Sequence, residues 1–126
     1  MSGEMIQHYR QLAVWQKSMD FADAVYDACS SFPKEELYGL TSQLKRSAIS
    51  VPSNIAEGAA RQGTGEFLQF LSIAKGSLAE LETQVILAQR RQFLSKEDME
   101  NLLEQADEIS RMLSGLQRSL KTKRAA

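Results

Sequence analysis

Apolar residues recur every three or four positions along four consecutive segments of this chain, and this spacing constrains the fold more than any other feature. Such a spacing gives an α-helix one continuous apolar stripe. No useful stretch alternates between apolar and polar residues, as a half-buried strand would. Only two prolines and seven glycines interrupt the sequence. The sequence therefore predicts an all-α protein.

Four helices joined by short connections account for the pattern. The first helix should end at Phe32-Pro33, because the residue before a proline is pushed out of the α region. Thr64 is the expected N-cap of the third helix, and Ser95 with Asp98 resembles a capping box before the fourth. Heptad-like spacing with short connections predicts an antiparallel up-down-up-down four-helix bundle. The expected helix ranges are 12–31, 36–60, 64–92 and 95–120.

One domain accommodates the whole chain. Its 126 residues are enough to bury a core of ordinary size. A content of 43% hydrophobic and 25% charged residues is typical of a globular protein. We divide the chain into a polar N-terminal lead (1–11), the four-helix bundle (12–120) and a basic C-terminal tail (121–126).

Three of the expected helices carry more apolar surface than one bundle core needs. On the first helix we assign the core to one of two neighbouring apolar lines, namely Leu12, Trp15, Met19, Ala22, Tyr26 and Cys29. Surplus apolar surface indicates self-association. The alternative is that the extra residues flank a single wide core, and we favour association. The candidate oligomer interface consists of Val14, Phe21, Ile49, Leu68 and Ile86.

A stripe of mostly small polar residues runs beside the core line of the expected second helix. Long flexible charges dominate an ordinary exposed helix face, so this composition indicates a polar surface packed between helices. The members of the stripe step by four and three positions: Gln43, Ser47, Ser50, Asn54, Glu57 and Arg61.

A hairpin that turns near residue 63 places Arg46, at the edge of this stripe, opposite Glu80 on the third helix. We therefore predict an Arg46–Glu80 ion pair, and a second pair between Glu57 and Arg61 at spacing i, i+4. The expected role is to fix the helix register, because partly buried charges must be matched; ligand binding is the alternative. We define the polar seam as Gln43, Arg46, Asn54, Glu57, Arg61 and Glu80.

Residues suited to catalysis or metal binding do not converge. The only histidine, His8, lies in the polar lead, and the only cysteine, Cys29, lies on the expected core line, where a thiol is a small buried hydrophobe. A carboxylate di-metal bundle requires Glu-x-x-His pairs on two helices, and the sequence has none. Gly63 and Gly65 are not accompanied by the lysine that a phosphate-binding loop requires. We therefore interpret these two glycines as part of a turn. We expect no enzymatic activity, no metal and no cofactor.

The overall charge gives no reason to expect binding to polyanions. Fifteen basic residues are balanced by 16 acidic ones, so no global field attracts nucleic acid or an anionic membrane. Any nucleic-acid contact must be local, and the alternative is that these residues are helix-end charges and a solubilising tail. The candidates are Arg90, Arg91, Lys121, Lys123 and Arg124. Without a signal peptide or an apolar run of membrane-spanning length, a cytoplasmic protein is expected.

A set of short motifs lies between residues 12 and 84, within a resemblance that extends over residues 12–120, nearly the whole chain. The motifs are LAVWQK at 12–17, FP at 32–33, YGLTSQ at 38–43, VPSNIAEG at 51–58, EF at 66–67, FL at 70–71 and IAKGSLAELETQ at 73–84. This set resembles the bacterial four-helix-bundle proteins encoded within intervening sequences of 23S ribosomal RNA genes, members of which are sometimes labelled ribosomal protein S23. The resemblance implies a cytosolic homo-oligomer, a ring of five bundles, whose biochemical function is largely unestablished.

A related branch comprises the accessory proteins of diversity-generating retroelements, which are basic barrels that bind nucleic acid and a reverse transcriptase. This chain departs from that branch because its charge is nearly balanced. The leading hypothesis is therefore a non-enzymatic, homo-oligomeric scaffold or adaptor that does not bind a membrane. The alternative is RNA or DNA binding by the assembled ring through local basic patches. If Phe21 and Ile86 lie at the subunit interface, a charge at either position should lower the oligomer mass and leave helicity intact.

Overall fold

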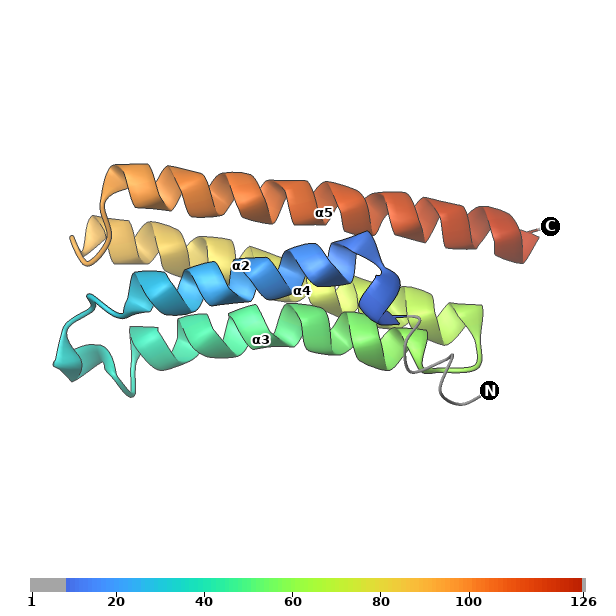
Figure 1. The fold of residues 1–126 in the computed structure, drawn as a ribbon, viewed down its shortest axis with the longest axis horizontal. Coiled ribbons are helices and arrows are strands. Elements are labelled where there is room, and N and C mark those ends of the chain that lie inside the picture. The colour runs from blue at the N-terminus through green and yellow to red at the C-terminus, as the bar shows by residue number, and fades with distance from the viewer. Residues whose placement is uncertain (1–8, 126) are drawn as a thin grey trace.

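The computed structural model describes residues 9–125, and in this range it contains helices and turns but no strand (Figure 1). A helical turn at residues 9–11 precedes the first long helix. The predicted all-α fold is confirmed, whereas His8 lies outside the described residues. The elements are α2 (Ala13–Cys29), the 3-10 turn η1 (Lys34–Glu36), α3 (Leu40–Ala59), α4 (Thr64–Arg90) and α5 (Lys96–Ala125).

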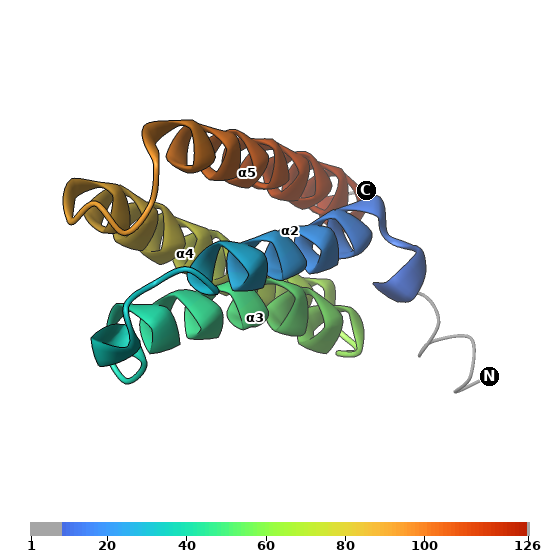
Figure 2. The ribbon, with the colours of Figure 1, turned by 60° about the vertical axis from the view of Figure 1, so that its left-hand side comes forward.

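The long helices form a bundle in which α3 packs against both α2 and α4, and α5 closes against α4 and α2 (Figure 2). The connections between consecutive long helices lie at alternating ends of this bundle. As a result, the C-terminus of α4 and the start of α5 share one end of the bundle, while the start of α2 and the end of α5 both lie toward the other (Figure 1). Within the described range, no helix has the length and apolar character needed to cross a membrane.

The second long helix begins four residues later than predicted. Residues 34–36 form a separate 3-10 turn, and α3 starts only at Leu40. The carboxylate Oε1 of Glu36 accepts a hydrogen bond from the backbone N–H of Leu40 at 3.2 Å. An acceptor at this point satisfies one of the N–H groups that a helix start leaves unpaired. Glu36, which precedes α3 in the sequence, therefore caps the N-terminus of this helix with its side chain.

Of the two predicted N-caps, one is confirmed and one is displaced. The hydroxyl of Ser95 accepts a hydrogen bond from the backbone N–H of Asp98 at 3.0 Å, as an N-cap does. Thr64 is instead the first residue of α4, and Gly63 occupies the N-cap position without a side-chain hydrogen bond.

A tight backbone turn ends α4. Gln92 has a φ of 66°, in the left-handed region. The Phe93 N–H donates to the carbonyl of Ala88, and the Gln92 N–H donates to that of Gln89, both at 2.9 Å. This pair of bonds is the Schellman motif. It turns the chain so that Phe93 meets Phe32, at 5.8 Å between ring centroids, and covers the end of the core.

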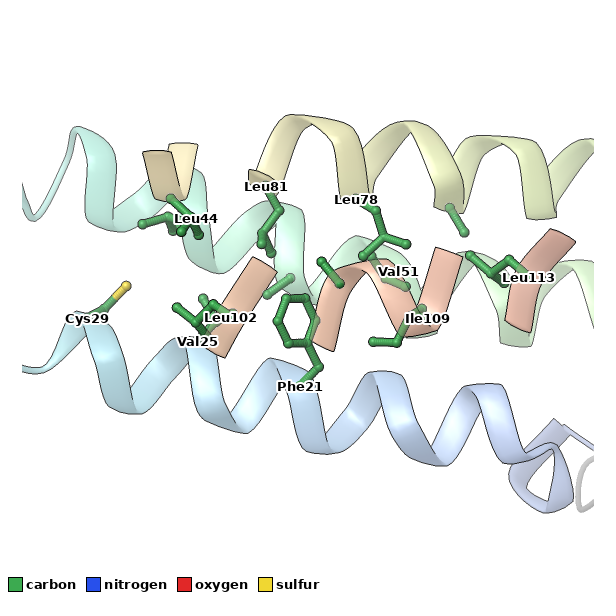
Figure 3. Packing of buried hydrophobic residues seen from close by; sticks show 14 of the residues in the cluster. Phe21, Val25, Cys29, Leu44, Val51, Leu78, Leu81, Leu102, Ile109 and Leu113 are labelled. Atoms are coloured by element: carbon green, nitrogen blue, oxygen red, sulfur yellow. The ribbon is translucent and has the colours of Figure 1, made fainter. Parts of the chain in front are cut away.

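The buried face of α2 is not the one predicted. Phe21 and Val25 point into the core, as Figure 3 shows, with 1% and 0% of their surface exposed. Met19 and Tyr26, on the predicted core line, are each 41% exposed. The core assignment is therefore wrong for Met19 and Tyr26. Cys29 is buried as predicted, and Leu12, Trp15 and Ala22 are partly buried against the edge of the core. Tryptophan and tyrosine carry polar atoms that need hydrogen-bond partners when buried. The aromatic side chain of the other apolar line is Phe21, which has no polar atom and needs no such partner.

Candidate functional site

A hydrogen-bonded group of small polar side chains lies between α3 and α4. The hydroxyls of Ser50 and Ser77 are 2.7 Å apart. The Asn54 amide Nδ2 donates to the Ser50 carbonyl at 2.8 Å and to its hydroxyl at 2.9 Å. Ser47 donates to Oε1 of Gln84 at 3.0 Å. We call these five residues the serine network. Because each hydroxyl or amide has its own partner across or along the helices, a slipped register would leave buried polar groups unpaired.

The charged members of the predicted polar seam do not take part in the serine network. Gln43, Arg46 and Glu80 are exposed, and Asn54 is the member of the predicted set that joins the serine network. Within residues 9–124 the ion pairs are Lys17–Glu108, Arg61–Glu57 and Arg111–Asp107. The predicted Arg46–Glu80 pair is wrong for the single chain. Ser50 faces Ser77 as the predicted register requires, but Arg46 and Glu80 lie on the outer sides of their helices, where long charges stay hydrated.

The second predicted ion pair is confirmed. Nη2 of Arg61 lies 3.1 Å from Oε1 of Glu57, at spacing i, i+4 near the end of α3. The guanidinium of Arg61 also lies 5.0 Å from the centroid of the Phe70 ring, close enough for a cation–π contact. Both charged side chains are about half exposed, so this pair orders the surface at the turn between α3 and α4 and contributes little to stability.

A second polar group connects α4 to α5. Nζ of Lys75 donates to the Ser114 hydroxyl at 2.9 Å and to Oε1 of Gln117 at 3.5 Å. The amide of Gln117 donates to the Ser72 hydroxyl at 3.2 Å. Nothing in the sequence pattern singles out these residues, because polar side chains at similar helical spacing are common on both helices. Together with the serine network, these hydrogen bonds fix the position of α4 along α3 on one side and along α5 on the other.

The predicted oligomer-interface residues divide into two groups. Val14 and Phe21 are buried in the core of the single chain, so their assignment to an exposed interface is wrong. The reason is the exchange of the two apolar lines on α2 described above. Ile49 and Ile86 are 47% and 43% exposed, and Leu68 is half-buried. Ile49 and Ile86 therefore still belong to surplus apolar surface, and Leu68 lies outside the two surfaces defined next.

Two exposed apolar surfaces result. The first is a groove of about 460 Å³ between α2 and α3, which we call the α2–α3 groove. A hollow of about 620 Å³ continues it past Ile49 to Tyr38, Lys45 and Arg46. The second surface is the outer side of α4, and we call it the α4 face. The groove is lined by Tyr9, Trp15, Met19, Ala22, Asp23, Tyr26, Ile49, Pro52, Ser53 and Ala56. The α4 face consists of Ile73, Gly76, Ala79, Glu80, Thr83, Ile86 and Leu87.

The predicted nucleic-acid contacts are exposed but are not brought together. Arg90 and Arg91 lie where α4 ends, and Lys121, Lys123 and Arg124 lie on the last turns of α5, at the opposite end of the bundle (Figure 1). The basic tail is a continuation of helix α5. The Arg124 guanidinium lies 3.1–3.3 Å from the point where a Cβ on Gly65 would sit, so it packs onto the start of α4.

The titratable side chains of residues 9–124 form no recognisable reaction centre. Cys29 is buried, as predicted, and burial raises the pKa of its thiol, an effect that the nearby Lys45 ammonium partly offsets. A protonated thiol is a poor nucleophile. No cluster of three or more histidine, cysteine or acidic side chains suited to a metal ion occurs in the part of the chain that the structure describes.

One carboxylate makes stability depend on pH. Burial raises the pKa of the half-buried Glu82, and the Asp107 carboxylate raises it further. The folded state therefore binds this proton more tightly than the unfolded chain. The resulting stabilisation is complete below the unfolded pKa of about 4.3 and is lost as pH rises through the folded pKa.

Replacing Glu82 with glutamine removes the unfavourable charge, and we expect Glu82→Gln to be more stable than the original chain at pH 7 by up to about 0.5 kcal/mol. The difference should shrink as pH falls toward about 4. Thermal unfolding between pH 7 and 4 measures both effects, with Glu104→Gln, an exposed position on α5, as the matched control. A gain for Glu82→Gln that stays constant with pH would contradict this account.

Comparisons with known proteins agree with the helical fold. The family model described as 23S rRNA-intervening sequence protein matches residues 10–115. Among solved structures, the chain is similar to a protein with unknown function from the S23 ribosomal protein family of Bacteroides thetaiotaomicron VPI-5482. The two are 25% identical, with a TM-score of 0.74, over 82% of this chain and 97% of the other. No curated protein matches the chain.

Proposed function

This chain belongs to the 23S rRNA-intervening sequence protein family, and we propose that it is a non-enzymatic, homo-oligomeric scaffold or adaptor of the cytoplasm. Its protomer is an antiparallel up-down-up-down bundle, and its assembly is a closed ring of five. The number five follows from the family resemblance stated above.

The observation that carries the proposal is the pair of exposed apolar surfaces. Met19, Tyr26 and Ile49 are each more than 40% exposed on the side of the α2–α3 groove. Ile73, Ile86 and Leu87 are equally exposed on the α4 face. Large apolar patches on a soluble bundle mark interaction sites. Two such surfaces on different helices support head-to-tail association, which closes into a ring when the rotation between subunits permits it.

Light scattering of the purified full chain tests the assembly. We expect a species of about five chain masses, and we expect Ile86→Glu to lower that mass because it places a charge on the α4 face. Circular dichroism should remain helical, since Ile86 is 43% exposed in the single chain. Asn101→Glu, at an exposed position on α5, is the control. A monomer at every concentration would overturn the proposal.

The second candidate function is nucleic-acid binding by the assembled ring. Its support is the end of the bundle where Arg124 packs beside Gly65, with Lys121 and Lys123 exposed nearby. A ring repeats this cluster in every subunit, so weak contacts add up. Phosphate contacts would make the binding strongly salt-dependent.

The same light-scattering measurement with total RNA at low and high salt decides between the two candidates. Gain of RNA mass at low salt, lost when Lys121, Lys123 and Arg124 are changed to alanine, would favour nucleic-acid binding. The matched variant changes Arg90 and Arg91, at the opposite end of the bundle. An assembly indifferent to RNA would favour the protein scaffold.

A further inference from the structure

We propose that the α2–α3 groove of one subunit receives the α4 face of the next, and that Arg46 and Glu80 form an ion pair across this contact. The inference rests on the proposed homo-oligomeric function and identifies the surfaces that meet. The occupant of the groove is a second copy of this chain.

The shapes of the two surfaces suit each other. The α2–α3 groove is concave, with Trp15 and Tyr26 from α2 and Pro52 from α3 along its sides. The α4 face is a convex helix surface. At its centre, Gly76 has no heavy atom within 4 Å of where its Cβ would lie. Glycine inside a helix is unfavourable relative to alanine, and no contact within the protomer requires glycine here. A glycine at this point lets the backbone of α4 approach another chain closely.

The apolar residues of the two surfaces are of matching character. The α4 face presents Ile73, Ile86 and Leu87, and the groove side presents Met19 and Ile49. All five side chains are more than 40% exposed in the single chain. Docking one surface on the other removes both sets from water in one contact, which is the main favourable term in association.

The charges indicate that the occupant is another copy of the same chain. Arg46 lines the hollow that continues the α2–α3 groove, and Glu80 lies on the α4 face. Both are exposed, and neither has an ion-pair partner among residues 9–124. One surface therefore contributes a positive charge and the other a negative charge beside apolar patches. Complementary charges across a contact fix partner choice and register. Because both surfaces belong to one chain and lie on different helices, each subunit can use both at once.

A charge exchange tests the pairing. The assembly mass is measured over a dilution series for the original chain, Arg46→Glu, Glu80→Arg and the double variant. Each single variant places like charges together, and we expect it to raise the dissociation midpoint by about tenfold or more. The double variant restores opposite charges with reversed sign and should recover most of the affinity. Glu100→Arg, at an exposed position on α5, is the control for charge alone.

The outcomes separate this inference from the proposed function. A monomeric original chain defeats the proposed function itself. An assembly whose midpoint is unchanged by both single variants, or is not recovered in the double variant, overturns the pairing while the assembly stands. Gly76→Gln is a second, steric test. Since nothing lies near Gly76 in the protomer, helicity should be retained and the assembly weakened. An assembly unaffected by Gly76→Gln shows that the α4 face is free, and also overturns the inference.

Discussion

Replacing Phe21 with alanine is expected to lower the free energy of unfolding by about 3–5 kcal/mol. Only 1% of the Phe21 surface is exposed, and its ring fills the middle of the bundle near Val25 and Ile109 (Figure 3). Alanine would leave a cavity surrounded by side chains from several helices. Because those helices are held by their other contacts, the space cannot close fully, and both the lost burial and the cavity destabilise the fold.

Urea unfolding followed by circular dichroism measures this effect, at one fixed protein concentration because assembly is coupled to stability. Asp20→Ala, at an exposed position on the same helix, should change the free energy of unfolding by less than about 0.5 kcal/mol. If Phe21→Ala instead lowered the assembly mass and left stability nearly unchanged, Phe21 would be an interface anchor, contrary to its burial.

Adding one methyl group at Gly58 is expected to be the second most damaging change, with a loss of about 1–3 kcal/mol for Gly58→Ala. A Cβ there would lie 2.7 Å from Cβ of Phe70 and 2.9 Å from Cδ1 of Phe67. The Cβ of Phe70 is fixed by its own backbone, so it cannot rotate away. Helices α3 and α4 would have to separate, which would also strain the serine network between them.

The control for Gly58→Ala is Gly115→Ala on α5. The nearest atom to a Cβ at Gly115 is Nη2 of Arg118 at 3.7 Å, an ordinary contact at the end of a flexible side chain. Alanine is the better helix former by up to about 1 kcal/mol, so Gly115→Ala should stabilise the chain. Chemical denaturation of both variants provides the comparison, and similar effects at the two glycines would show that α3 and α4 are not in close contact at Gly58.

The helical periodicity of the sequence predicts the all-α fold and most of the helix ranges correctly. The motifs at residues 12–17 and 51–58 also identify the family, which the match over residues 10–115 confirms. Both results depend on local patterns that repeat over many residues, and one misplaced residue changes little. The start of α3 is less predictable, because Glu36 caps it from an adjoining 3-10 turn.

The orientation of α2 could not be predicted from its sequence. Its two apolar lines lie side by side, and one contains Trp15 and Tyr26 while the other contains Phe21 and Val25. Periodicity alone favours neither line. The choice depends on which side chains fill the space between α3, α4 and α5, which is a property of the assembled core.

The candidate site shows the same division. The register of α3 against α4 was predictable, and the Glu57–Arg61 pair follows from helix spacing. The Arg46–Glu80 pair does not form within the chain. The register of two helices sets which residues lie at the same level along the bundle axis, but it does not set whether their side chains point toward each other. Ser77 escapes notice in the sequence because single polar residues on a helix are common.

The end of α5 determines where a group attached to the C-terminal side of the bundle would start. The start of α2 and the end of α5 lie toward the same end of the bundle, away from the turn between α4 and α5 (Figure 1). A tag, fluorophore or cargo protein joined after the end of α5 would therefore start from this end of the bundle, away from the turn between α4 and α5. In a ring whose subunits all point the same way, every attached group would lie on one face of the ring. The opposite face would carry no attached group and could be used to immobilise the assembly.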